Sequence, residues 1–296
     1  MPYFCRSKRN FVLNYSKKTD APMVYNSGTI KMKKCFVVFS ALVLIAFCSC
    51  NKITLSGNNI TKEFSIEGSY TELVVENAFD VTVSDAVSQI TVTTDENVMP
   101  KVVVEKDGDK LKIHLKPLSI NFGTDLELKV VLPYNADLTS VDLSGASEFY
   151  SEYGLAGETV EVELSGASDF YCDIEADTID MDLSGASNVE GTIDASELDL
   201  EMSGASDATL RGQVTTLDLD LSGASSIKET ISGSSYGFEC DFCNGEMSGS
   251  SDAYIHCNLM IKVDLSGASD LHYTGNASTT DSTTSGGSNI SHDVLP

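Results

Sequence analysis

The chain has 296 residues, enough to bury one or two hydrophobic cores, and it is strongly acidic, with 44 Asp and Glu residues against 19 Lys and Arg residues. Residues 1–50 carry eight of the basic groups and one acid, which leaves a net charge of −32 in residues 51–296. So acidic a surface repels phosphate groups, which argues against nucleic acid as a partner.

The N-terminal segment 32–50 is typical of a lipoprotein signal peptide. A basic start, Met32–Lys34, precedes the apolar run Phe36–Phe47. As a helix, that run would span about 18 Å, which is too short for a bilayer core of about 30 Å. The segment ends in Phe47-Cys48-Ser49-Cys50, which resembles a bacterial lipobox, so we predict lipidation of Cys50 after cleavage. An uncleaved membrane anchor is the alternative.

The segments on either side of this signal carry weaker patterns. Residues 1–31 show no repeat or periodicity, and we predict that they are a start-site overcall or disordered. Residues 51–63 are a predicted linker, and residues 64–138 a predicted N-terminal β region with a hairpin at Asp107-Gly108-Asp109. We expect this region to form a β-sandwich-like cap on the segment that follows. Its predicted strands are Leu73–Val75, Val81–Val83, Ile90–Val92, Val102–Val104, Leu111–Ile113 and Leu126–Leu132.

Residues 139–276 are a repeat. The tetrapeptide SGAS occurs six times, and SGSS and SGGS continue it, at intervals of 21, 19, 19, 19, 26, 18 and 19 residues. Apolar residues stand one, three and five positions before most of the repeats, with polar residues between them, which is the alternation of a half-buried strand. The repeats begin at Ser144, Ser165, Ser184, Ser203, Ser222, Ser248, Ser266 and Ser285.

Strands of this kind cannot bury their apolar faces alone, so successive coils must stack at the strand spacing of about 4.8 Å. Glycine in each turn accepts backbone angles that a Cβ atom would forbid. We therefore predict an all-β protein: a parallel β-helix-like β-solenoid of about 19-residue coils with SGAS turns, preceded by a strand-rich N-terminal region. Residues 277–296 are either a polar tail or a degenerate last coil.

These features resemble a known family. The repeated Ser-Gly-Ala-Ser after a short strand, the strand-rich lead-in and the closing Tyr273-Thr274-Gly275 are similar to the putative auto-transporter adhesin, head GIN domain family, over residues 64–276. The resemblance implies an exported protein or lipoprotein of a Bacteroidetes-type bacterium. The family is one of unknown function, so its name implies adhesion without defining a ligand.

Acidic residues recur two positions before the repeat serines. If the coils stack in register, each neighbouring pair of charges costs about 0.9 kcal/mol even at the dielectric constant of water. One interpretation is that the carboxylates lie in solvent and keep an exported rod soluble. The other is that Ca²⁺ bridges adjacent coils, although the calcium-binding nonapeptide of other β-helices is absent. The residues are Asp142, Glu163, Asp182, Glu201, Asp220, Glu246 and Asp264.

Two further groups are candidates for binding. Tyr150, Tyr171 and Tyr254 stand six residues after their repeat serines, where exposed rings would form a binding face for a protein or glycan ligand; the alternative is that they fill the core or a corner.

Cys240 and Cys243 form one CxxC motif, with His256 and Cys257 following, and a zinc site is one interpretation. A single CxxC in an exported protein favours buried packing or a disulfide, so no metal site is firmly predicted. Cys172 has no obvious partner.

The sequence predicts no catalytic residues. The four histidines are scattered, and carboxylate pairs that recur in every coil indicate scaffold rather than an active site. We therefore predict a non-enzymatic cell-envelope lipoprotein, held at the outer membrane by lipid on Cys50, that acts as an adhesin or surface binding module. The alternatives are a periplasm-facing structural or envelope-stress protein and, third, a polysaccharide-active β-helix enzyme.

Overall fold

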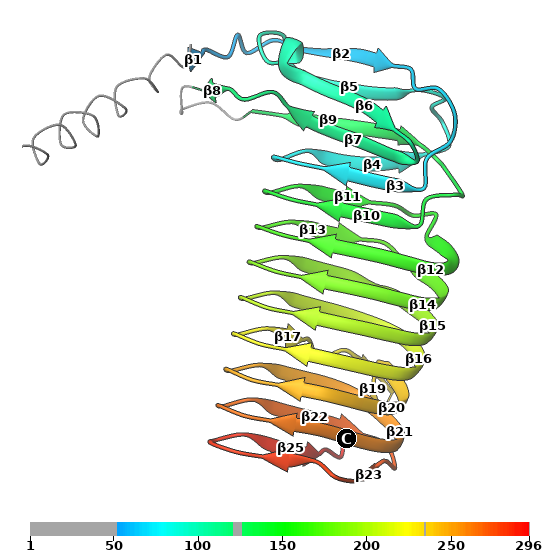
Figure 1. Cartoon of the computed structure of the whole chain (residues 1–296), viewed down its shortest axis with the longest axis vertical. Coiled ribbons are helices and arrows are strands. Elements are labelled where there is room, and N and C mark those ends of the chain that lie inside the picture. The colour runs from blue at the N-terminus through cyan, green and yellow to red at the C-terminus, as the bar shows by residue number, and fades with distance from the viewer. Residues whose placement is uncertain (1–51, 121–125, 234, 296) are drawn as a thin grey trace, which may run out of the picture. The chain divides into compact units, whose positions relative to one another are not determined.

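The computed structural model describes residues 52–120, 126–233 and 235–295, all within the second of two units, 1–50 and 51–296, into which the chain divides. Successive strands of this second unit stack as the coils of a β-solenoid (Figure 1). This confirms the predicted all-β solenoid with a strand-rich N-terminal region. One short 3-10 helix, η2 (Met99–Lys101), interrupts the strands.

One continuous sheet folds around the core in two layers, which we call the first sheet and the second sheet. The first sheet contains the strands that run into each turn, and their pairing is parallel and in register, so that Val160, Ile179, Leu198 and Leu217 lie in one column. These strands are β10 (Ser140–Leu143), β12 (Leu155–Leu164), β14 (Ile174–Leu183), the later parts of β15 (Asn188–Met202) and β16 (Asp207–Leu221), β20 (Phe238–Met247) and the later part of β21 (Asp252–Leu265).

The second sheet contains the strands that follow each turn. Because β15, β16 and β21 begin in this sheet and end in the first, the chain passes from one to the other at a corner without leaving strand geometry. The remaining strands of the second sheet are β11 (Glu148–Tyr150), β13 (Asp169–Tyr171), β17 (Ser226–Ile227), β22 (Asp270–Thr274) and β25 (Asn289–His292).

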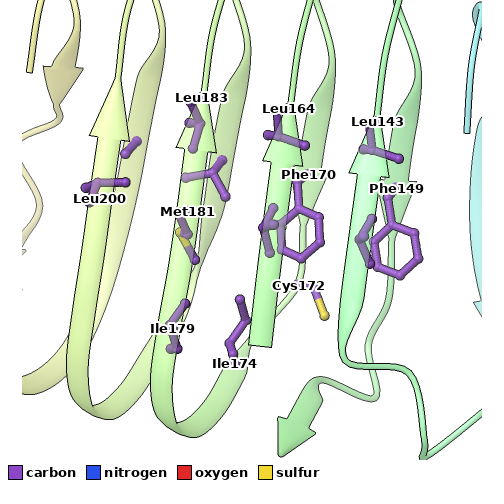
Figure 2. Close-up of a cluster of buried hydrophobic side chains, with 14 of the residues drawn as sticks. Leu143, Phe149, Leu164, Phe170, Cys172, Ile174, Ile179, Met181, Leu183 and Leu200 are labelled. Atoms are coloured by element: carbon purple, nitrogen blue, oxygen red, sulfur yellow. The ribbon is translucent and has the colours of Figure 1, made fainter. Parts of the chain in front are cut away.

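Apolar side chains from both sheets meet between them. Figure 2 shows Leu164, Met181 and Leu200 of the first sheet pointing inward, with Phe149 and Phe170 of the second sheet. The two phenylalanine rings stack with centroids 5.4 Å apart, and all five residues are at most 2% exposed. The period-2 alternation therefore sends every second side chain into one continuous core.

The SGAS turns explain why coils can stack so closely. The glycines hold φ between +73° and +84°. The N–H of the residue after each glycine, which is alanine in the SGAS turns, donates at 2.7–2.8 Å to the carbonyl of the residue at the glycine position of the preceding coil. The last serine of each turn is buried in the coils from Ser168 to Ser269, and its hydroxyl donates to the carbonyl of the first serine at 2.6–3.0 Å. Each turn thus satisfies its own buried hydroxyl and adds to a ladder along the stack.

The N-terminal region continues the same stack. Strands β3 (Glu72–Val75) and β4 (Asp80–Ser84) pair parallel with β10 and β11, and β7 (Lys110–Leu115) and β9 (Leu128–Pro133) pair parallel with β3 and β4. Between β3 and β4, Asn77 takes the place of the turn glycine, with φ +88° and a carbonyl that accepts from Ala146 at 2.7 Å. Parallel coil pairing therefore already includes residues before 139, through a turn that no longer reads SGAS.

Antiparallel strands then close this end. Strand β6 (Val102–Asp107) pairs with β7 through the predicted hairpin, and β5 (Ile90–Asp95) joins β9 to the edge strand β2 (Asn59–Phe64). Their inward residues, including Val92, Val102 and Val130, belong to the same core as the solenoid. The arrangement therefore differs from the expected β-sandwich-like cap, because a parallel coil extends directly into the antiparallel strands. A small parallel pair, β1 (Lys52–Ile53) with β8 (Ser119–Ile120), lies beside it.

The C-terminal residues form a last coil. Strands β23 (Ser278–Thr279), β24 (Thr283–Thr284) and β25 pair with β21 and β22, and Gly286 occupies the turn position above Gly267. The 26-residue interval in the repeat holds an inserted antiparallel hairpin, β18 (Ile231–Ser232) with β19 (Ser235–Tyr236). Side chains of the last coil are mostly polar and exposed, so this coil covers the apolar end of the stack.

Candidate functional site

The acidic residues that stand two positions before the repeat serines lie in one column on the outside of the first sheet. Each one is the strand-register partner of the next, and all but the half-buried Asp142 are exposed. Burial, followed by the charges of Asp142 and Asp182, raises the pKa of Glu163. We call this set the acid column: Asp142, Glu163, Asp182, Glu201, Asp220, Glu246 and Asp264.

A basic group lies near one end of the acid column, and a hydroxyl group binds its other end. At the N-terminal end, Lys110 pairs with Glu72 at 2.5 Å, and this bond, together with the charges of Asp142 and Glu163, raises the pKa of Lys110 against the effect of its burial. At the C-terminal end, Thr283 donates to Asp264 through its hydroxyl at 2.6 Å and its N–H at 3.1 Å. The repulsion between like charges is therefore greatest in the middle of the column.

A second set of carboxylates lies beside the acid column. Glu161, Asp180, Asp199 and Asp218 are register partners, and burial, followed by Asp180 and Asp218, raises the pKa of Asp199. The two columns enclose a shallow cavity of about 300 Å³. Within the described ranges, no three His, Cys, Asp or Glu side chains converge as metal ligands would. The calcium ladder consequently stays a prediction.

A groove with a volume of about 690 Å³ follows the corner between the two sheets. Glycine and alanine residues such as Ala176 and Ala195 form its floor, and acidic residues such as Glu175, Asp194 and Glu239 line its rim. None of its lining residues is aromatic or basic. It adds a third acidic surface to the solenoid.

The tyrosines of the candidate binding face do not form one stripe. Tyr150 and Tyr171 are register partners on the second sheet, whereas Glu190 follows Tyr171 in the same column and Tyr254 lies several coils further on. Tyr150 is 46% exposed, while Tyr171 and Tyr254 are half-buried. Tyr254 stacks on His272, with ring centroids 4.7 Å apart and planes 8° apart. The three tyrosines therefore provide two separate aromatic positions.

The core thiols are close together but inaccessible. Cys240 and Cys257 are register partners on β20 and β21, and Cys243 lies on the same strand as Cys240. All are buried and free, as is Cys172. The contact of Cys240 with Cys243, together with burial, raises the pKa of Cys240. Burial raises the pKa of Cys172 to about 12. These thiols pack as small apolar groups.

One pocket is not predictable from the sequence, because its residues come from three distant segments. It lies where β2 ends, β5 begins and β9 ends, and it has a volume of about 370 Å³. Phe64, Tyr70 and Tyr134 contribute aromatic rings, and Gln89 and Asn135 contribute amides. None of its lining residues is charged. No local motif relates these positions, so only the pairing of β2, β5 and β9 brings them together.

The histidines remain apart from any catalytic arrangement in the described ranges. His272 bonds Asp293 at 3.0 Å, but the hydroxyl of Ser291 donates to that same carboxylate rather than to an imidazole. His256 bonds Thr274 at 2.9 Å. The predicted lipidation site, Cys50, lies outside the described residues. No described helix is both long and apolar enough to cross a bilayer.

Solved structures share this fold. A putative adhesin from Parabacteroides merdae aligns with a TM-score of 0.71 and 19% identity, covering 81% of this chain and 98% of its own. A putative adhesin from Parabacteroides distasonis aligns with a TM-score of 0.69 and 19% identity, covering 81% and 100%. A protein of the same organism, described as a putative lipid binding protein, aligns with a TM-score of 0.67 and 18% identity, covering 81% and 98%.

No curated protein matches the chain. A family model described as "putative auto-transporter adhesin, head GIN domain" matches twice, over residues 69–194 and 181–277, which together include the N-terminal coil and the SGAS repeats. The chain belongs to this head GIN domain family.

Proposed function

We propose that this protein is an exported lipoprotein of the outer membrane, held by lipid on Cys50, whose solenoid serves as a non-enzymatic adhesin or surface binding module. The family and the structural neighbours described as adhesins support binding to some ligand rather than catalysis. The acidic charge of residues 51–296 and the apolar run before Cys50 support export and solubility outside the cell.

The observation that carries the proposal is the in-register stack itself. Each coil adds the same inward core and turn, while the outer positions of both sheets remain free to vary. Such a scaffold presents exposed side chains at fixed spacing on a rigid support, which lowers the entropic cost of binding an extended ligand. Within the described ranges, the carboxylates and hydroxyls recur as scaffold instead of converging on one reacting atom.

The anchor is tested with two neighbouring cysteines. We expect Cys50→Ala to abolish lipid modification and release the protein into the soluble fraction, because thioether attachment needs the residue that becomes the new N-terminus. Cys48→Ala is the matched control and should stay membrane-bound. Mass spectrometry of the purified protein and detergent phase partition measure both effects. A Cys50→Ala protein that keeps its lipid would overturn the proposed anchor.

The location is tested by protease shaving of intact cells, followed by immunoblotting for residues 51–296. Loss of the signal without release of a periplasmic marker supports the adhesin. Protection until the outer membrane is permeabilised would favour the alternative, a periplasm-facing structural or envelope-stress protein. Degradation of acidic or neutral polysaccharides by the purified chain would instead support the third interpretation, an enzyme.

A further inference from the structure

The uncharged pocket at the N-terminal end of the stack differs from every other hollow described above. The grooves along the solenoid are lined by carboxylates, whereas this pocket combines aromatic rings with hydroxyl and amide groups and has no charged lining residue. Its volume of about 370 Å³ lies within the range of small-molecule sites, about 300–1,000 Å³. In a chain of net charge −25, such a neutral site favours a neutral ligand.

Its rings are held in place from behind. Tyr134 is 47% exposed, and its ring packs against Tyr153 with centroids 4.9 Å apart. The hydroxyl of Tyr153 in turn accepts a hydrogen bond from the N–H of Asp85 at 3.2 Å. Tyr70 is 6% exposed, and burial raises its pKa to about 12, so this phenol stays neutral. A ligand would meet a supported aromatic surface whose side-chain entropy is already reduced.

The polar groups of the pocket are arranged but not all used. Register pairing of Phe64 with Ile90 sets Ser65 beside Gln89, and the Ser65 hydroxyl donates to the Gln89 Oε1 atom at 3.3 Å. In the described part of the chain, no hydrogen bond engages the Gln89 Nε2 atom or the hydroxyls of Ser69 and Ser88. These groups therefore remain available as donors and acceptors at the rim.

We propose that this pocket binds a neutral carbohydrate, with a sugar ring on Tyr134 and its hydroxyl groups on Gln89, Ser69 and Ser88. A sugar ring presents C–H groups on its faces and hydroxyl groups around its edge, which matches an aromatic wall with a polar rim. A purely apolar ligand would match the rings but would make no use of the rim groups. The net negative charge of the chain opposes an anionic sugar.

This inference deepens the proposed function, since it names the ligand class of an adhesin, but its test needs only the purified chain in solution. Residues 51–296 are screened on an array of neutral, sialylated and sulfated oligosaccharides, and hits are titrated by calorimetry as free oligosaccharides. Failure of the shaving experiment would leave the calorimetry intact, and the reverse also holds.

Variants locate the site. We expect Tyr134→Ala to weaken binding of a neutral hit about fivefold or more, and Tyr134→Phe to keep it within about twofold, because the ring supplies the contact. Ser88→Trp, at an exposed rim position, should block the pocket without disturbing the core. Leu259→Ala, at a residue 53% exposed on β21, is the control and should bind like the wild type. Thermal melting confirms that each variant is folded.

Three outcomes would overturn the proposal. The first is that no neutral oligosaccharide binds the wild-type chain in the array or at millimolar concentration in the calorimeter. The second is that Tyr134→Ala and Ser88→Trp both bind a neutral hit as tightly as the wild type does. The third is that the pocket variants change the binding of sialylated or sulfated oligosaccharides alone, which would assign the pocket to another ligand class.

Discussion

At the scale of single residues, the turn glycines are constrained both in backbone conformation and in space. A Cβ atom on Gly204 would lie 2.3 Å from the carbonyl oxygen of Gly185, and the residue's φ is +76°. The glycine therefore serves both the left-handed backbone and the close approach of the next coil. Asn77 provides the left-handed backbone in the N-terminal coil, which lies at the beginning of the turn ladder.

Replacing one of these glycines tests the two effects separately. We expect Gly204→Ala to lower the free energy of unfolding by about 2–4 kcal/mol, the sum of left-handed strain and a displaced backbone. Gly233→Ala has a similar φ of +65° but open space around it, so it should cost only about 1 kcal/mol. Urea unfolding measures both. Equal losses would show that the close approach between coils contributes nothing.

The core cysteines give a second test at this scale. Because Cys172, Cys240, Cys243 and Cys257 are buried and free, we expect the native chain 51–296 to be nearly inert toward a thiol reagent. After unfolding without reductant, all four thiols should react. A count of two would instead indicate a disulfide, for which the register partners Cys240 and Cys257 are one candidate pair.

At the scale of elements, the first sheet has one face of apolar residues and one face that carries the acid column. The inner alternation provides the stabilising burial, whereas the acid column places carboxylates at adjacent register positions. Exposure to solvent keeps the repulsion small enough for the stack to form. Lys110 and Thr283 reduce it only at the two ends of the column.

Removing a charge from the acid column should stabilise the fold, because each carboxylate has acidic neighbours in register. We expect Glu163→Gln to raise the free energy of unfolding by up to about 1 kcal/mol at low salt, since it removes repulsion from Asp142 and Asp182. The gain should fade in 0.5 M NaCl as screening increases. Glu67→Gln, in an exposed turn, is the control. A variant no more stable than the control would mean that the column carries no net repulsion.

The stability of the fold should depend on pH through the Glu163 carboxyl group. Glu163 has a pKa raised in the folded state, so the folded chain binds this proton more readily than the unfolded chain. Its contribution to stability is complete below the unfolded value, about 4.3, and is lost as pH rises through the folded pKa. The advantage of Glu163→Gln should thus shrink as pH is lowered from 7 toward 4.5.

Thermal melting distinguishes Ca²⁺ binding at the acid column from simple charge repulsion. If Ca²⁺ bridges the acid column, a chelator will lower the melting temperature and millimolar Ca²⁺ will raise it more than an equal ionic strength of NaCl. Unchanged melting on adding the chelator would leave solvated repulsion as the explanation.

At the scale of the whole molecule, the stack is modular along its axis but closed at both ends. Coils with the same register contact only their neighbours, while antiparallel β5, β6 and β2 close one end and the polar last coil closes the other. At the C-terminal end, Tyr236 of the inserted hairpin donates to Asp293 at 2.6 Å, which ties the insertion to the last coil. The ends should therefore tolerate change less well than the middle.

Deleting one coil tests this modularity. Removal of residues 184–202 joins Leu183 to Ser203 and preserves every column, so we expect a folded, monomeric protein with a moderately lower melting temperature. Deleting residues 184–193 instead breaks the register and should prevent folding. Circular dichroism and size-exclusion chromatography compare the two. A misfolded whole-coil deletion would contradict the nearest-neighbour description.

The repeat by itself determines most of the arrangement of the solenoid. Because inward residues, turn glycines and acidic positions recur about every 19 residues, their columns follow directly from the sequence, and the register confirms them. The N-terminal coil was not recognised as one, because its turn reads Glu76-Asn77-Ala78-Phe79 and only parallel pairing with β10 and β11 identifies it.

The tertiary structure alone decided where uncharged binding groups gather. Phe64, Gln89 and Tyr134 are far apart in the chain and follow no period, so nothing local relates them. Antiparallel pairing of β2, β5 and β9 brings them to one pocket. A periodic sequence specifies contacts between its own copies, whereas a site built from unlike segments depends on long-range pairing that no repeat encodes.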